Sequence, residues 1–123
     1  GLAGKPLRDH RFLGPIVRRR AIELLGDVAV NLAGRHPGEA ARCVALLLTG
    51  LADGMADVRL RAAQILGKVA ASAEALAGQC AAALEKAARR ERDGEVREIA
   101  ARAVSQANGV VVASGAPVSQ SLW

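Results

Sequence analysis

Aromatic side chains are almost absent from this sequence. Its 123 residues include one phenylalanine, Phe12, one tryptophan, Trp123, and no tyrosine. Pockets lined by rings and platforms for base stacking are therefore excluded. The hydrophobic share of 51% consists largely of small side chains, with 27 alanines. Because alanine has the highest helix propensity and lets backbones approach closely, we expect closely packed helices and no β fold.

Cysteines and long apolar runs are also scarce. Cys43 and Cys80 are too few for a disulfide framework, and no Cys-x-x-Cys pair or metal-spaced His/Cys cluster is present. A reducing, intracellular setting, cytoplasmic or nuclear, is therefore expected. The longest nearly apolar run, 43–52, is well short of the roughly 20 residues that a membrane span needs, so no membrane contact is expected.

The motifs that carry catalysis are missing as well. The sequence has no glycine-rich phosphate loop, no Gly-x-Ser-x-Gly and no evident Cys/His or Ser/His/Asp grouping. His10 and His36 are followed by Arg11 and Pro37 and not by the glutamate of a His-Glu metal-binding pair. We therefore expect no enzyme activity, no cofactor and no metal.

Positive charge is concentrated at one end. The net charge is +5, and residues 1–20 hold six cations against one acid, whereas the other residues balance. Arg18, Arg19 and Arg20 are the densest part of this basic end. It is interpreted either as a solvated charged end or as a contact for an acidic protein or for the phosphate backbone of a nucleic acid.

A repeated string is the main positive signal. Val-Arg, followed by an alanine three residues later and by Leu-Gly or Val-Ser, begins at Val17, Val58 and Val96. The offsets between copies are 41 and 38 residues. A period near 40 with helical punctuation is typical of stacked two-helix repeats.

Capping and breaking residues predict the elements. Pro15 suits the first turn of a helix, Asp57 is expected as an acidic N-cap, and Asn108-Gly109 is expected to stop the last helix. Residues 1–14 are expected to be irregular or a short helix, and 109–123 an extended tail. The predicted helices span 15–33, 39–52, 57–72, 73–90 and 95–108.

Two glycines, Gly26 and Gly67, fall inside predicted helices, where each would cost about 1 kcal/mol. We expect the close approach of the paired preceding helix to compensate this cost.

Across about residues 7–108 the chain resembles the HEAT-repeat, armadillo-like family. The resemblance lies in the Asp-Gly turn before the second helix, the Val-Arg pair, the small residue and the Leu-Gly pair. It implies an all-α fold, a short α-solenoid of about two and a half stacked HEAT-type helix pairs with a non-helical C-terminal tail.

In that family an acid six residues before the arginine joins a ladder between repeats. Asp53 and Arg59 have this spacing, as do Glu91 and Arg97, so the resemblance implies that these four are ladder residues and not ligand contacts. Phe12 takes the acidic position in the first copy.

HEAT proteins mostly present their second helices as a concave wall, which implies a non-catalytic protein–protein interaction scaffold, a fragment or subunit of a larger assembly. The partner would be another protein or the rest of a longer solenoid, contacting the wall and the open ends. Nucleic-acid binding through the basic end is the alternative, and a merely solvated wall a third interpretation. Leu60 and Ile99 are expected as exposed apolar anchors, and the tail as extended or seated in a partner's groove. The candidate contact residues are Arg19, Arg20, Leu60, Arg61, Gln64, Lys68, Glu98, Ile99, Arg102 and Trp123.

Overall fold

The computed structural model describes residues 14–113, which form five α-helices and one short 3₁₀ helix. This confirms the all-α class. Residues 1–13 and 114–123, including Trp123, lie outside the described residues. None of the helices within 14–113 has the length and apolar character needed to cross a membrane. The elements are α1 (Pro15–Ala33), α2 (Pro37–Leu48), η3 (Thr49–Ala52), α3 (Ala56–Ser72), α4 (Glu74–Arg90) and α5 (Gly94–Ala113).

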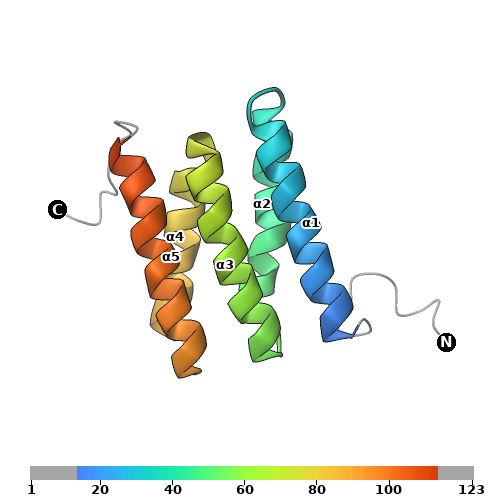
Figure 1. Cartoon of the computed structure of the whole chain (residues 1–123), viewed down its shortest axis with the longest axis vertical. Coiled ribbons are helices and arrows are strands. Elements are labelled where there is room, and N and C mark those ends of the chain that lie inside the picture. Colours follow the sequence, from blue (N-terminus) through green and yellow to red (C-terminus); the bar gives the residue numbers. More distant parts are fainter. Residues whose placement is uncertain (1–13, 114–123) are drawn as a thin grey trace.

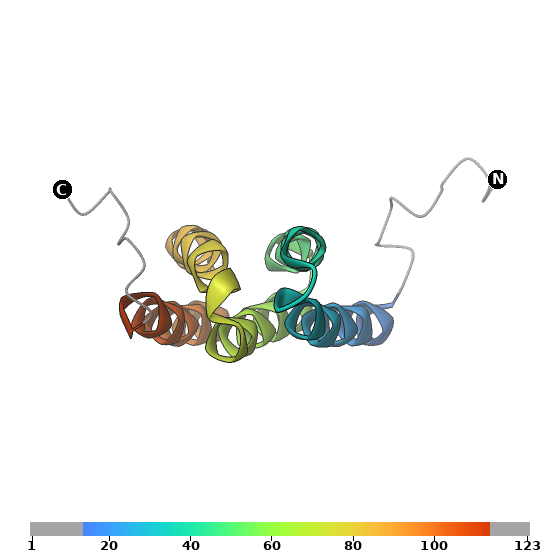
Figure 2. The ribbon, with the colours of Figure 1, turned by 90° about the horizontal axis from the view of Figure 1, so that it is seen from above.

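The helices form two layers. Helices α1, α3 and α5 lie side by side in one layer, and α2 and α4 form the second (Figures 1 and 2). Helix α1 packs on α2, and α4 packs on both α3 and α5. Helix α3 therefore lies in the middle of the array, with α1 and α5 at its two edges.

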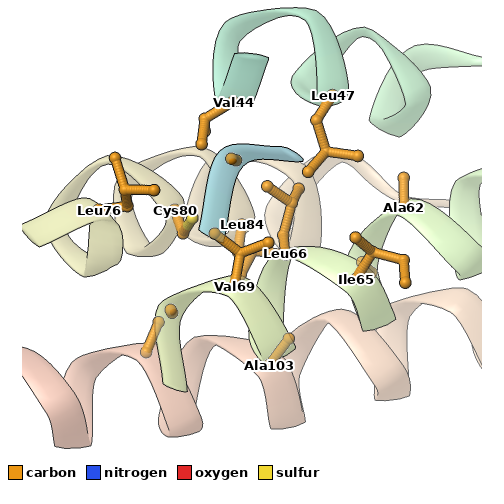
Figure 3. Close-up of a cluster of buried hydrophobic side chains, with 14 of the residues drawn as sticks. Val44, Leu47, Ala62, Ile65, Leu66, Val69, Leu76, Cys80, Leu84 and Ala103 are labelled. Atoms are coloured by element: carbon orange, nitrogen blue, oxygen red, sulfur yellow. The ribbon is translucent and has the colours of Figure 1, made fainter. Parts of the chain in front are cut away.

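The core lies between the layers and is made of aliphatic side chains of moderate size. Leu47 of α2, Leu66 of α3 and Leu84 of α4 are fully buried and meet there (Figure 3). Eight residues of α3 are buried, more than in any other described helix, as expected for the central element. Their apolar periodicity of three and four residues places one broad face against the second layer.

Close approach between helices occurs at three glycines. A Cβ on Gly26 would lie 2.5 Å from Cγ2 of Ile65 in α3, and one on Gly67 would lie 3.2 Å from Cβ of Ala103 in α5. Both contacts are therefore within the three-helix layer, and the expectation that the paired preceding helix approaches them is wrong. Gly50, which the sequence did not single out, faces Ile22 of α1.

Two helix starts differ from the expected ones. Asp57 is not an N-cap, because α3 begins at Ala56 after Met55, whose extended backbone is the N-cap. Asp53 supports this turn instead, since its Oδ1 accepts the Met55 N–H at 2.9 Å. Pro37, expected in a loop, begins α2, where a missing N–H costs nothing.

The last helix ends later than predicted. The expected stop at Asn108-Gly109 does not occur, and α5 runs to Ala113, so 109–113 are helical where an extended tail was expected. Val110 and Val111 are partly buried against the core. Burying these two side chains outweighs the cost of about 1 kcal/mol for Gly109 in a helix.

Replacing Gly50 with alanine is expected to lower the free energy of unfolding by about 1–3 kcal/mol, because the new Cβ would lie 2.9 Å from the rigid Cβ of Ala62. Gly78→Ala is the matched control, since a Cβ there meets nothing within 4 Å in the middle of α4. This variant should gain up to about 1 kcal/mol of stability from helix propensity. Urea denaturation of both variants measures the two effects, and equal shifts would contradict the packing argument.

Candidate functional site

An arginine–carboxylate ladder links successive turns at one end of the array. Arg18 of α1 donates from Nε to Asp53 Oδ2 at 2.8 Å and from Nη2 to Asp53 Oδ1 at 3.0 Å. Both side chains are nearly buried. This bidentate geometry fixes the guanidinium and carboxylate planes relative to each other.

The second rung repeats this geometry. Arg59 donates from Nε to Glu91 Oε1 at 2.9 Å and from Nη2 to Oε2 at 3.1 Å. Its Nη1 reaches back to the carbonyl oxygens of Asp53, at 2.9 Å, and Gly54, at 3.3 Å. Each acid is thus paired with the arginine of the preceding motif copy, whereas the arginine six residues later binds its main chain.

Arg97 ends this ladder. Its Nη1 contacts the carbonyl oxygen of Glu91 at 3.4 Å, and it forms no ion pair within residues 14–113. Arg18, in contrast, does not belong to a free basic end. Arg18 takes the arginine position of the first Val-Arg copy, which was the sequence signal for a ladder residue. The signal was missed because Phe12, and not an acid, lies six residues before Arg18, whereas the actual partner, Asp53, comes later in the chain.

The ladder also sets the ionisation of its acids. Burial by itself would raise the pKa of Asp53 and of Glu91. Hydrogen bonds from Arg18 to Asp53 and from Arg59 to Glu91, with backbone N–H donors, outweigh it and lower both pKa values below their usual range. Both acids are therefore charged at neutral pH.

The outer face of α1, α3 and α5, called the three-helix face, holds most of the predicted contact residues. Between α3 and α5 it has a shallow groove of about 310 Å³. Arg61 donates to Glu23 of α1 at 2.8 Å and to Gln64 at 3.1 Å, which ties α3 to its neighbour. Five of the predicted residues line the groove: Arg61, Gln64, Lys68, Ile99 and Arg102.

The other predicted contact residues do not line this groove. Arg19 and Arg20 are exposed on α1, and Arg20 contacts Glu23 at 3.2 Å. Glu98 is exposed and pairs with Arg102 along α5 at 2.7 Å. Leu60 is half-buried.

The two apolar anchors expected on this face are not free side chains. Leu60 and Ile99 are both half-buried, and Ile99 packs against the core. Ile99 lines the groove between α3 and α5 and so partly fills the space between these two helices. This corrects the expectation of exposed apolar anchors on the wall.

A stripe of exposed apolar side chains lies elsewhere, on the outer edge of α1. Val17, Leu24 and Val28 are 51%, 55% and 43% exposed, and Ala21 lies between them in the same stripe. The steps of four, three and four residues place these four side chains on one side of the helix. We call this stripe the α1 edge. Its heptad-like spacing was the signal that sequence reasoning missed.

Cys80 does not supply a reactive group. Burial raises the pKa of the Cys80 thiol to about 11, so it is protonated at neutral pH. Cys43 is half-buried, and both thiols are free. Within residues 14–113 no three His, Cys, Asp or Glu side chains gather as a metal site would require.

Comparisons with protein-family models, curated proteins and solved structures found no match to this chain. The surfaces are therefore interpreted from their own geometry. The resemblance to HEAT repeats, carried by the three motif copies in the sequence, stays a prediction.

Acid is expected to weaken the fold through the ladder. Because the folded-state pKa values of Asp53 and Glu91 are lowered, unfolding takes up protons, and their contribution is lost as pH falls below about 4. The double variant Asp53→Asn/Glu91→Gln should be less stable than wild type at pH 7. On unfolding in acid it should bind fewer protons than wild type does, by at most about two. Urea titrations between pH 2 and 7 measure this.

The control is Asp57→Asn, an exposed acid that forms no ion pair within the described range. It should keep the wild-type dependence on pH. An equally steep loss of stability in the double variant would show that other groups cause the acid sensitivity.

Proposed function

We propose that this chain is a non-catalytic protein-interaction module, a HEAT-type α-solenoid segment that binds a protein partner or forms part of a larger intracellular assembly. The observation that carries the proposal is the apolar α1 edge. Monomeric proteins rarely leave contiguous apolar surface in water, so a stripe of this kind favours a covered interface.

The α1 edge faces away from the array. Gly26 contacts α3. Because Gly26 lies two residues before Val28, these two residues are on opposite sides of the helix. Helix α1 ends its layer, with α3 on one side only (Figure 2). Leu46 of the neighbouring helix α2 is also 56% exposed. A helix seated along α1 would bury this stripe much as α3 buries the opposite side.

The other edge of the array, on α5, is mostly polar, although Val112 near the C-terminal end of the helix is 64% exposed. Ala103 lies beside Gly67 of α3. The side chains about half a turn around the α5 axis from Ala103 therefore face outward, and they include Arg97, Ala101 and Asn108. All three are exposed. An array of repeats needs a polar surface wherever its stack ends, and most of the α5 edge comes closer to that requirement than the α1 edge does. The contrast supports a partner at the α1 edge.

The nucleic-acid alternative has less support. The guanidinium of Arg18 is held by Asp53, which leaves Arg19 and Arg20 as the exposed arginines of α1 at that end. Arg20 is itself in contact with Glu23. A phosphate-binding surface would need a wider group of unpaired cations than residues 14–113 supply at that end, and Lys5, Arg8 and Arg11 lie outside the described residues.

Affinity capture from the lysate of the source organism tests the proposal. Leu24→Asp/Val28→Asp should reduce recovery of a specific protein partner by about tenfold or more, since it places charge in an apolar interface. Ala101→Asp, on the exposed side of α5, is the matched control and should leave recovery unchanged. Circular dichroism and thermal unfolding establish that each variant is folded.

Nuclease treatment distinguishes the two functions. Recovery that survives nuclease and depends on the α1 edge supports the interaction module. Recovery that requires nucleic acid and is lost in Arg19→Glu/Arg20→Glu, but not in the edge variant, would replace it with phosphate-backbone binding.

A further inference from the structure

A second and larger groove lies on the other side of the molecule from the three-helix face. It has a volume of about 650 Å³ and runs between the end of α2 with η3 on one side and the C-terminal half of α4 on the other. Figure 2 shows α2 and α4 as the two members of the second layer. We call this the α2–α4 groove. Its volume falls in the range of sites that hold small ligands or a short peptide segment.

The α2–α4 groove is partly apolar. Leu48 and Leu51 line it from one side and Ala83 and Ala87, one helical turn apart on α4, from the other. All four are half-buried. Since two alanines face two leucines, the short side chains on α4 leave space for an apolar side chain of a ligand.

The charge around the groove is positive because its acids are already engaged. Asp53 and Glu91 line the groove, but their carboxylates are held by Arg18 and Arg59. Three exposed cations on the same lining, Lys86, Arg90 and Arg92, form no ion pair within residues 14–113. Lys86 and Arg90 lie one turn apart on the same side of α4.

We propose that the α2–α4 groove binds an acidic peptide segment of a partner protein, with one apolar side chain seated against the leucines and carboxylates paired with Lys86, Arg90 and Arg92. Charge complementarity selects an acidic ligand, and the apolar lining selects a peptide over a nucleic acid. A phosphate backbone would use the cations but leave Leu48 and Leu51 uncovered, and the described lining has no aromatic ring on which a base could stack. This site goes beyond the interface proposed at the α1 edge and does not depend on it.

The test uses the full chain and a dye-labelled nonapeptide of Asp and Glu with one central leucine, followed by fluorescence anisotropy at about 50 mM salt. Lys86→Glu/Arg90→Glu should weaken binding by tenfold or more. Lys68→Glu/Arg102→Glu is the matched control, because it changes the net charge equally on the three-helix face and should weaken binding less than about threefold. Equal losses in the two variants would overturn the site, since they would show a general effect of net charge.

A second pair of measurements tests the apolar part of the groove. Replacing the central leucine of the peptide with serine should weaken binding by about tenfold, and Ala87→Phe, which fills the groove without changing charge, should do the same. Unaltered binding of the serine peptide would overturn the proposal. A competition experiment gives the second such outcome: an unlabelled nine-residue oligothymidine that displaces the labelled peptide from wild type at a lower concentration than the unlabelled peptide does. Urea denaturation establishes that the variants are folded. The edge variant Leu24→Asp/Val28→Asp should bind the peptide as wild type does, which separates this site from the α1 edge.

Discussion

Close contact between helices is the constraint on which this structure depends. With almost no aromatic rings, the core must be built from alanines and aliphatic side chains of moderate size, so backbones have to approach one another. Gly26 and Gly67 mark the two contacts within the three-helix layer, and Gly50 the contact between η3 and α1. At each position an added Cβ would collide with a neighbouring side chain. Small residues thus set the spacing of the layers, and larger side chains fill what remains.

The ladder is possible because of that spacing. When helices lie close and in register, the turn before α3 comes within reach of an arginine on α1, its neighbour in the three-helix layer, as Arg18 and Asp53 show. Arg59 spans two turns at once, through Glu91 and through the carbonyl oxygen of Asp53. Such pairs add less to stability than their geometry suggests, because both charges lose water. Their larger effect is to fix how far one helix can slide along the next.

Most of the helices could be predicted from local sequence, whereas the ends of the helices were predicted less well. Hydrophobic periodicity and the Val-Arg copies indicated the helices because both depend on contacts repeated every three or four residues. The end of α5 could not be read in this way, because Gly109 is unfavourable locally and the gain from burying Val110 and Val111 comes from distant neighbours. Arg18 was misjudged for the same reason, since its partner lies 35 residues ahead.

The exposed surfaces follow from how the structure uses its acids. Residues 21–123 carry equal numbers of cationic and acidic side chains, so composition predicted no charged patch there. Folding pairs two of those acids, Asp53 and Glu91 at the turns, with Arg18 of α1 and Arg59 of α3. The cations at the end of α4, which composition would have balanced against them, are left exposed beside an apolar groove. Residues 21–123, which carry no net charge, thus acquire a positive surface because two of their carboxylates are paired with arginines that link neighbouring helices.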